Sequence, residues 1–158
     1  MVFAKTHAAA GKMSALIAEG KMTKEYYAVV RGEPENKSGI LEDLLFKDSS
    51  KNKSFVVKRM RKGVKKASLE YETQKTLTDG DKKYSLVKIK LHTGRTHQIR
   101  VQFSSRKMPL LGDGKYGGKC EGCKTALWSY SLSFLHPFTG KEIFVNEPAP
   151  SVHPWNMF

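Results

Sequence analysis

Long apolar runs are missing from this sequence. Its longest uninterrupted runs, such as residues 8–10 and 28–30, are only a few residues long. A membrane-spanning helix needs about 20 apolar residues in a row, and a secretion signal also needs a continuous apolar core. We therefore expect a cytoplasmic protein that does not bind membranes.

Cysteine occurs only twice, as Cys120 and Cys123 in a Cys-x-x-Cys spacing among glycines. Structural zinc sites use four ligands. The sequence offers neither a second cysteine pair nor a paired spacing among its histidines, which are His7, His92, His97, His136 and His153. A loop disulfide or an adventitious metal ion stays open. In a reducing cytosol, however, we expect two ordinary loop thiols and no metal site.

Acidic residues are scarce relative to basic ones. The chain has 15 Asp and Glu against 28 Lys and Arg, a formal net charge of +13 at pH 7. This balance favours a polyanionic partner, because neutralising phosphates releases condensed counterions. We expect nucleic acid. A merely well-solvated basic surface is the alternative, and an anionic membrane fits less well because no basic amphipathic helix is evident.

The pattern of apolar residues predicts one sheet-rich domain with two helices. At 158 residues and 39% hydrophobic content the chain suits a single domain. Thr6 is expected to cap a helix that ends at Gly20 and packs one face on the sheet. Thr96 is expected to cap a second helix, with Ile99 and Phe103 facing inward. Strands are predicted at residues 24–31, 40–46, 54–57, 67–77, 84–91, 126–134 and 141–145.

Within this pattern, residues 24–31 contain a continuous apolar run, which predicts burial on both faces of that strand. A dense basic run follows at residues 58–66, with no acidic residue inside it. It is either a solvated, mobile loop or a rim that contacts phosphates without reading sequence, and we favour the second. Its basic residues are Lys58, Arg59, Arg61, Lys62, Lys65 and Lys66.

The most informative segment is His92-Thr93-Gly94-Arg95-Thr96-His97-Gln98-Ile99-Arg100. Arg95 in the turn and Arg100 in the helix place two guanidinium groups where they can converge on a phosphate or a carboxylate. With Leu110-Leu111-Gly112-Asp113 and Lys24-Glu25-Tyr26, this segment resembles the RluA-like family of RNA pseudouridine synthases. The segments 2–6, 132–134 and 136–137 extend that resemblance over nearly the whole chain.

The resemblance implies an α+β fold, with a mixed, mainly antiparallel sheet, flanking helices and an RNA cleft along the sheet. Residues 1–158 would form a single, N-terminally incomplete catalytic domain. The implied reaction converts uridine to pseudouridine in rRNA or tRNA and needs no cofactor. The sequence does not fix the oligomeric state, and it does not say which uridine is modified.

The resemblance also implies roles for individual residues. Tyr26 would lie against the target base, with Tyr27 facing the opposite side of the strand, and Lys24 would be structural or contact a phosphate. Arg100 would pair with the catalytic aspartate, and without that partner its buried guanidinium would be left unpaired. Arg95 and His97 would bind RNA or serve as scaffold residues. Asp113 is expected to fix its loop.

One family element is absent from the sequence. The His-Arg-Leu-Asp-x-x-Thr-Ser-Gly run, which carries the nucleophile, would precede Val2. We therefore expect this chain to be inactive alone. The alternative is a nucleophile-free RNA-binding module of the same fold. A continuous upstream reading frame encoding His-Arg-Leu-Asp favours the enzyme, whereas a stop codon favours the module.

Overall fold

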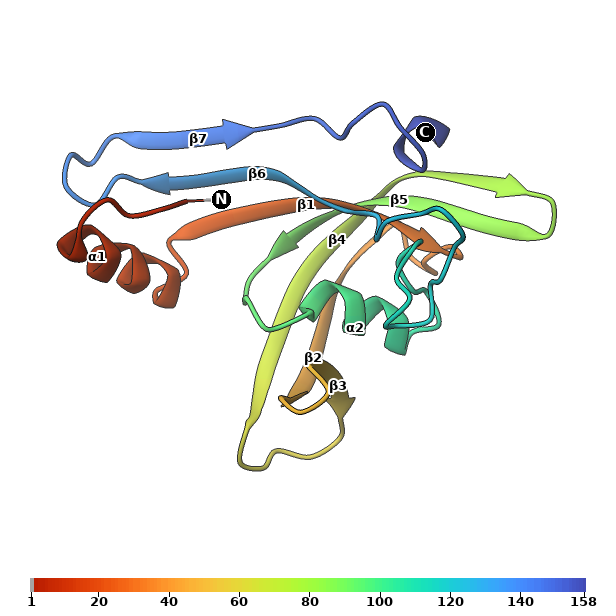
Figure 1. Cartoon of the computed structure of the whole chain (residues 1–158), viewed down its shortest axis with the longest axis horizontal. Helices are drawn as coiled ribbons and strands as arrows, with labels where there is room; N and C mark the ends of the chain where they lie inside the picture. Colours follow the sequence, from red (N-terminus) through yellow and green to blue (C-terminus); the bar gives the residue numbers. More distant parts are fainter. Residues whose placement is uncertain (1) are drawn as a thin grey trace.

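The computed structural model describes residues 2–158 as one seven-stranded antiparallel sheet with two α-helices (Figure 1). The strand order is β3-β2-β4-β5-β1-β6-β7. This arrangement confirms the predicted α+β class and the mainly antiparallel sheet. The elements are α1 His7–Ala18, β1 Met22–Arg31, β2 Ser38–Asp48, β3 Lys53–Val57, β4 Val64–Asp79, β5 Lys82–Leu91, α2 Gln98–Ser105, β6 Leu127–Leu135, β7 Glu142–Asn146 and the 3-10 helix η1 Trp155–Met157.

Strand β1 lies inside the sheet, between β5 and β6. Its residues Ala28, Val29 and Val30 are fully buried. Ala28 and Val30 pack in one apolar cluster with Phe103 of α2, whereas Val29 packs in a second cluster that includes Leu111. Because side chains alternate along a strand, these two clusters lie on opposite faces. The predicted burial on both faces is therefore confirmed for this half of β1.

Helix α2 covers one face of the sheet, and its own residues Ile99 and Phe103 are buried, as predicted. The predicted cap at Thr96 is wrong. His97 is the N-cap residue, with φ of 53°, and its side chain makes no capping hydrogen bond. The backbone carbonyl of Thr96 instead accepts a hydrogen bond from the Ser54 hydroxyl of β3. This tertiary contact holds the backbone of Thr96 against β3.

Helix α1 begins and ends where the sequence predicts. The Thr6 hydroxyl accepts from the Ala9 N–H, and Gly20 adopts φ of +69° while the Lys21 N–H bonds the Leu16 carbonyl. The expectation that one face packs on the sheet is wrong, because no described residue of α1 is buried and Ile17 is 51% exposed. The apolar side of α1 lines cavities instead.

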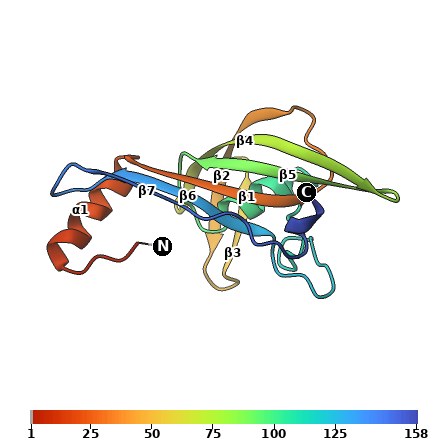
Figure 2. The same ribbon diagram turned by 90° about the horizontal axis from the view of Figure 1, so that it is seen from above.

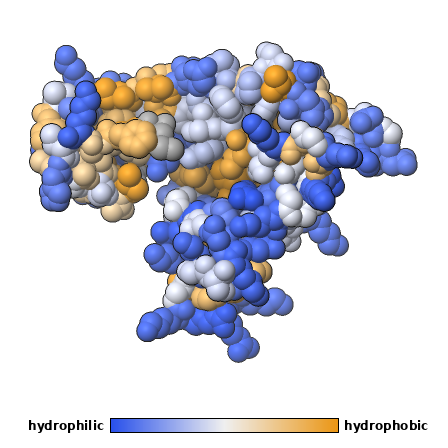
Figure 3. Space-filling model, in the orientation of Figure 1, coloured by the Kyte–Doolittle hydropathy of each residue, from blue (hydrophilic) through white to orange (hydrophobic). Residues whose placement is uncertain are grey.

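Strands β2, β3 and the start of β4 form an arm that projects from the rest of the sheet (Figure 1). The predicted basic run occupies the β3–β4 connection and the first residues of β4, and all six of its basic side chains are exposed. Figure 3 shows the arm as mostly hydrophilic, whereas apolar side chains gather over α1. Figure 2 shows β3 turned away from the plane of β1 and β6.

A glycine-rich loop connects α2 to β6 and contains both cysteines. Gly122 has φ of +68°, which closes a tight turn and places the Cα atoms of Cys120 and Cys123 5.3 Å apart. Their Sγ atoms form a disulfide, so the prediction of two ordinary loop thiols is wrong. Among residues 2–158, neither helix is long and apolar enough to cross a membrane.

Candidate functional site

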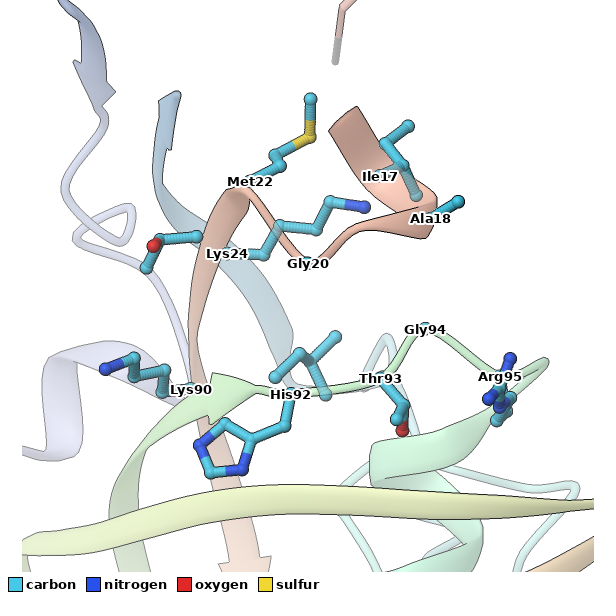
Figure 4. Close-up of a pocket in the computed structure, with 12 residues that line it drawn as sticks. Ile17, Ala18, Gly20, Met22, Lys24, Lys90, His92, Thr93, Gly94 and Arg95 are labelled. Carbon is cyan, nitrogen blue, oxygen red and sulfur yellow. The ribbon is translucent and has the colours of Figure 1, made fainter. Parts of the chain in front are cut away.

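Two adjoining cavities lie on the sheet beside α1: the first faces the loop that joins β5 to α2, and the second faces β1 and β6. The larger has a volume of about 450 Å³, and the residues that line it include Lys24, His92 and Arg95. The side chain of Lys90, whose backbone borders the same cavity, points to the other face of the sheet, where it pairs across the strands with Glu25. Figure 4 shows that Lys24 comes from β1 and Arg95 from the loop after β5, so two distant segments build this cavity. Its volume lies within the range of small-molecule sites.

The second cavity, of about 390 Å³, is apolar and contains Tyr26. Ile17, Met22 and Lys24 line both cavities, which makes them neighbours. Burial raises the pKa of the Tyr26 hydroxyl above its ordinary value of 10.0, and the Ser129 hydroxyl partly offsets this effect. The phenol therefore stays protonated at neutral pH.

The local backbone places Tyr26 at an irregularity of the sheet. The register between β1 and β6 shifts between Glu25 and Tyr26, a β-bulge of the kind found next to active sites. Tyr27 faces the other side, where its ring lies 4.7 Å from that of Tyr130. The predicted opposite orientation of the two tyrosines is therefore confirmed.

The buried side chain of Gln98 holds the loop of residues 92–95 by hydrogen bonds. The Gln98 Oε1 atom accepts hydrogen bonds from the Thr93 hydroxyl and the Arg95 N–H, and its Nε2 atom donates to the Ser68 carbonyl. A single amide thus joins the loop, α2 and β4. Gln98 is therefore a framework residue, and the outer surface of the loop borders the larger cavity.

Arg95 lies between the larger cavity and a small one of about 180 Å³, which Lys47 and Lys65 also line. Its Nε atom donates to the Lys66 carbonyl at 2.9 Å. The side chain is thereby oriented along the surface from the loop toward the basic arm. Arg95 therefore connects the larger cavity with the basic run of β4.

Arg100 does not have the environment that the sequence predicts. Its Nε and Nη2 atoms donate to the two carboxylate oxygens of Asp113, both at 2.7 Å, so the expectation of an unpaired guanidinium is wrong. Asp113 is fully buried and also accepts from the backbone N–H groups of Lys115 and Tyr116. Its predicted role in fixing the loop is confirmed. These hydrogen bonds raise the pKa of Arg100 above its ordinary value.

Tyr116 extends this network to His97. The Tyr116 ring lies beneath the Arg100 guanidinium, 5.0 Å from it, and its hydroxyl accepts from the Ser54 N–H and lies 3.0 Å from His97 Nδ1. Burial, and then the positive charge of Arg100, lower the pKa of His97 below its ordinary 6.5. These contacts are those of a scaffold histidine, the second of the two roles considered for His97.

A model of the family described as RNA pseudouridylate synthase matches residues 1–105. The chain belongs to this family. It is 35% identical to an uncharacterized RNA pseudouridine synthase of Aquifex aeolicus, with 98% of this chain and 52% of that protein covered. It is 30% identical to ribosomal large subunit pseudouridine synthase D of Vibrio cholerae, with 95% and 48% covered. The chain spans about half the length of these curated relatives.

Two solved structures have a similar fold. Human RNA pseudouridylate synthase domain containing 1 matches with a TM-score of 0.78 at 24% identity, covering 96% of this chain and 64% of the other. Human RNA pseudouridylate synthase domain containing 4 matches with a TM-score of 0.72 at 20% identity, covering 92% and 64%.

The predicted site residues of this family member fall into three groups. Tyr26 and Arg95 line adjoining cavities, and Lys24 contributes to both of these. The six basic residues of the arm are exposed. Among the described residues, Arg100 and His97 line neither of the two larger cavities and belong to the network around Asp113.

Sequence reasoning gave Tyr116 no role, whereas the fold places it between Arg100 and His97. Tyr116 does follow the Leu-Leu-Gly-Asp segment closely. Its aromatic ring next to a buried carboxylate was a usable signal.

The buried Arg100–Asp113 pair predicts a large loss of stability on removal of one charge. Asp113→Asn leaves the guanidinium without its carboxylate, and we expect the free energy of unfolding in urea to fall by about 3–5 kcal/mol. The control is Glu33→Gln, which breaks an exposed pair with Lys83 and is expected to cost no more than about 1 kcal/mol. Equal effects of the two substitutions would contradict this account.

His97 predicts a measurable pH response. Lys115 is one of the positive charges that lower the pKa of His97, so Lys115→Gln should move that pKa upward toward 6.5 in an NMR titration of the ring protons. Because the folded-state pKa lies below the unfolded one, the stability from neutral His97 is complete above pH 6.5 and declines as pH falls toward the folded-state pKa. Lys119→Gln, in the glycine-rich loop, should leave the pKa of His97 unchanged. An unmoved His97 titration in Lys115→Gln would reject this assignment.

Proposed function

We propose that the whole protein converts uridine to pseudouridine in RNA and that the two adjoining cavities are the substrate site. The observation that carries this proposal is Tyr26, which lies in an apolar cavity directly beside a basic one. A nucleotide needs both environments, since its base is flat and aromatic while its phosphates are anionic. Residues 1–158 are proposed to form a single partial catalytic domain.

The proposed reaction explains the need for an enclosed aromatic site. The C1′–N1 glycosidic bond breaks and a C1′–C5 bond forms, while C5 loses one proton and N1 gains one. No cofactor is needed, because the product has the same atoms as the substrate. A stacked base must first leave its helix and be held during this exchange. The ring of Tyr26 offers a stacking surface, and the surrounding apolar side chains exclude water.

The basic residues form a proposed path for the RNA backbone. Lys24 lies at the larger cavity, Arg95 links it to Lys65, and the exposed residues of the arm follow. Lysine and arginine on such a path contact phosphates and position the RNA without reading its sequence. The path supports RNA as the partner, with the base of one flipped nucleotide directed toward Tyr26.

Arg100 is proposed as a positioning residue. Through Asp113 and Tyr116 it fixes α2, whose N-terminal side carries the loop of Arg95. Its pairing within the chain also supports the second hypothesis, a non-catalytic RNA-binding module, because its guanidinium does not need a further carboxylate. The upstream reading frame separates the two hypotheses, since only the enzyme requires an encoded His-Arg-Leu-Asp segment.

The proposal also concerns which class of RNA is the substrate. One similar protein is named for the large ribosomal subunit. We therefore favour rRNA over tRNA as the substrate.

The proposed backbone path predicts weaker and less salt-dependent RNA binding when its charges are removed. We expect Arg95→Gln with Lys65→Gln to lower the slope of log affinity against log salt by about 0.7 per residue for single-stranded RNA. Fluorescence anisotropy with a labelled oligonucleotide measures this slope. Lys82→Gln, at the start of β5, is the control and should keep the original slope. An unchanged slope in the double variant would remove the path from the proposal.

Tyr26 predicts a loss of uridine conversion. In the chain extended upstream along its own reading frame, Tyr26→Leu should lose one base–aromatic stack, about 1–3 kcal/mol or roughly 5- to 150-fold in kcat/KM. Release of tritium from C5-labelled uridine in RNA reports the reaction. Tyr27→Leu, on the opposite face, is the matched control and should retain activity. Equal losses in both variants would count against a stacking role for Tyr26.

A further inference from the structure

A cluster of metal-ligating side chains lies outside the two cavities of the proposed substrate site. Cys120 and Cys123 of the glycine-rich loop meet His153 of the C-terminal segment, and the ligand atoms of all three lie within 4.8 Å of one another. Figure 2 shows the loop and the C-terminal segment side by side at one end of the sheet. His153 lies thirty positions beyond Cys123, so sequence spacing alone did not join it to the pair.

The cysteine pair is held in place by its loop. The Arg31 Nη2 atom donates to the Lys119 carbonyl at 2.6 Å, and the Gly112 N–H donates to the Gly118 carbonyl at 2.8 Å. The turn at Gly122 then directs both sulfur atoms to the same side, as their bonding shows. A Cys-x-x-Cys turn of this kind supplies two thiolates from one short segment, the usual half of a zinc site.

The C-terminal segment is held against the same loop by apolar packing. Trp155, Met157 and Phe158 pack on the buried cluster that contains Val29, and Cys120 packs on this cluster too. His153 precedes Trp155 by two residues, so this packing fixes its distance from the sulfur atoms. The convergence of the three side chains thus follows from the tertiary structure.

We propose that, in the reduced protein, Cys120, Cys123 and His153 bind one divalent metal ion, with Zn²⁺ as the best fit. Two thiolates and one imidazole are ligands that Zn²⁺ prefers, and water takes the fourth tetrahedral position. His153 is exposed and the cysteines are partly exposed, so an ion can enter from solvent. The bound ion ties the glycine-rich loop to the C-terminal segment and stabilises the fold by mass action.

The disulfide and the metal site are alternative states of the same pair. A dithiol or phosphine reductant supplies the two electrons that break the S–S bond, and the two sulfurs take up two protons. On binding the ion, the thiols release these protons to solvent and both sulfurs become ligands. The metal therefore binds only after reduction. A preparation kept oxidised serves as an internal control.

The test uses the full chain, reduced with a phosphine and titrated with Co²⁺ under argon. We expect saturation at one ion per chain, with the visible absorption bands of tetrahedral thiolate coordination, and displacement by Zn²⁺. The oxidised chain should show no such bands. Absence of saturable binding to the reduced chain would overturn the proposal.

Variants separate the three ligands. Cys120→Ser with Cys123→Ser should abolish the bands, and His153→Gln should weaken Co²⁺ binding by at least about tenfold, because loss of a ligand costs no less than loss of a supporting contact. His136→Gln is the matched control, since this histidine lies in the β6–β7 turn beside Thr139. Binding by His153→Gln as tight as that of the unmodified chain would reject the three-ligand site. Circular dichroism spectra check that each variant is folded.

Discussion

The buried pair of Arg100 and Asp113 is the interaction on which the site region depends. Asp113 is fully buried, and its carboxylate accepts from the guanidinium and from two backbone N–H groups of its own loop. Burial of a carboxylate is tolerated when its oxygens are satisfied in this way. The pair therefore joins α2 to the glycine-rich loop. It also sets the position of Tyr116, which reaches β3 through Ser54.

This network explains how an irregular loop acquires a fixed shape. Helix α2 has no side-chain cap, and the side chain of its first residue, Gln98, is instead hydrogen-bonded to Thr93, Arg95 and Ser68. The position of the loop that carries Arg95 is therefore set by its hydrogen bonds to Gln98, which is itself bonded to Ser68 of β4. Since α2 is itself held through Asp113, the loop at the larger cavity is linked to the buried pair although Arg100 does not touch the cavity.

The sequence predicted the regular elements well because each had a local signal. The pattern of apolar residues marked β4 and β5, and Thr6 and Gly20 marked the two ends of α1. Features decided by tertiary contacts were not predictable in this way. The Thr96 carbonyl accepts a hydrogen bond from Ser54 of a distant strand, and the apolar face of α1 lines a cavity.

The site was predictable in part for the same reason. The resemblance identified Tyr26 and Arg95, and the fold places them on adjoining cavities. The partner of Arg100 was not predictable from the motif, because the resemblance implied a carboxylate outside the chain whereas the fold supplies one thirteen positions away. The motif around Arg100 is the same whether Arg100 pairs with an aspartate outside the chain or with Asp113, so only the fold distinguishes the two.

The distribution of acidic residues determines which basic side chains are neutralised by a nearby carboxylate. Glu25, Asp43 and Asp113 each form an ion pair with a neighbouring Lys or Arg inside the fold, which neutralises those basic side chains. Between Asp48 and Glu70 the chain has no acidic residue at all, so the charges of the arm are not neutralised locally. Part of the net charge of +13 is therefore concentrated on the arm. In the proposed function, such a surface raises the local concentration of RNA beside the two cavities, and the cavity of Tyr26 adds a contact with the base that the phosphate backbone does not make.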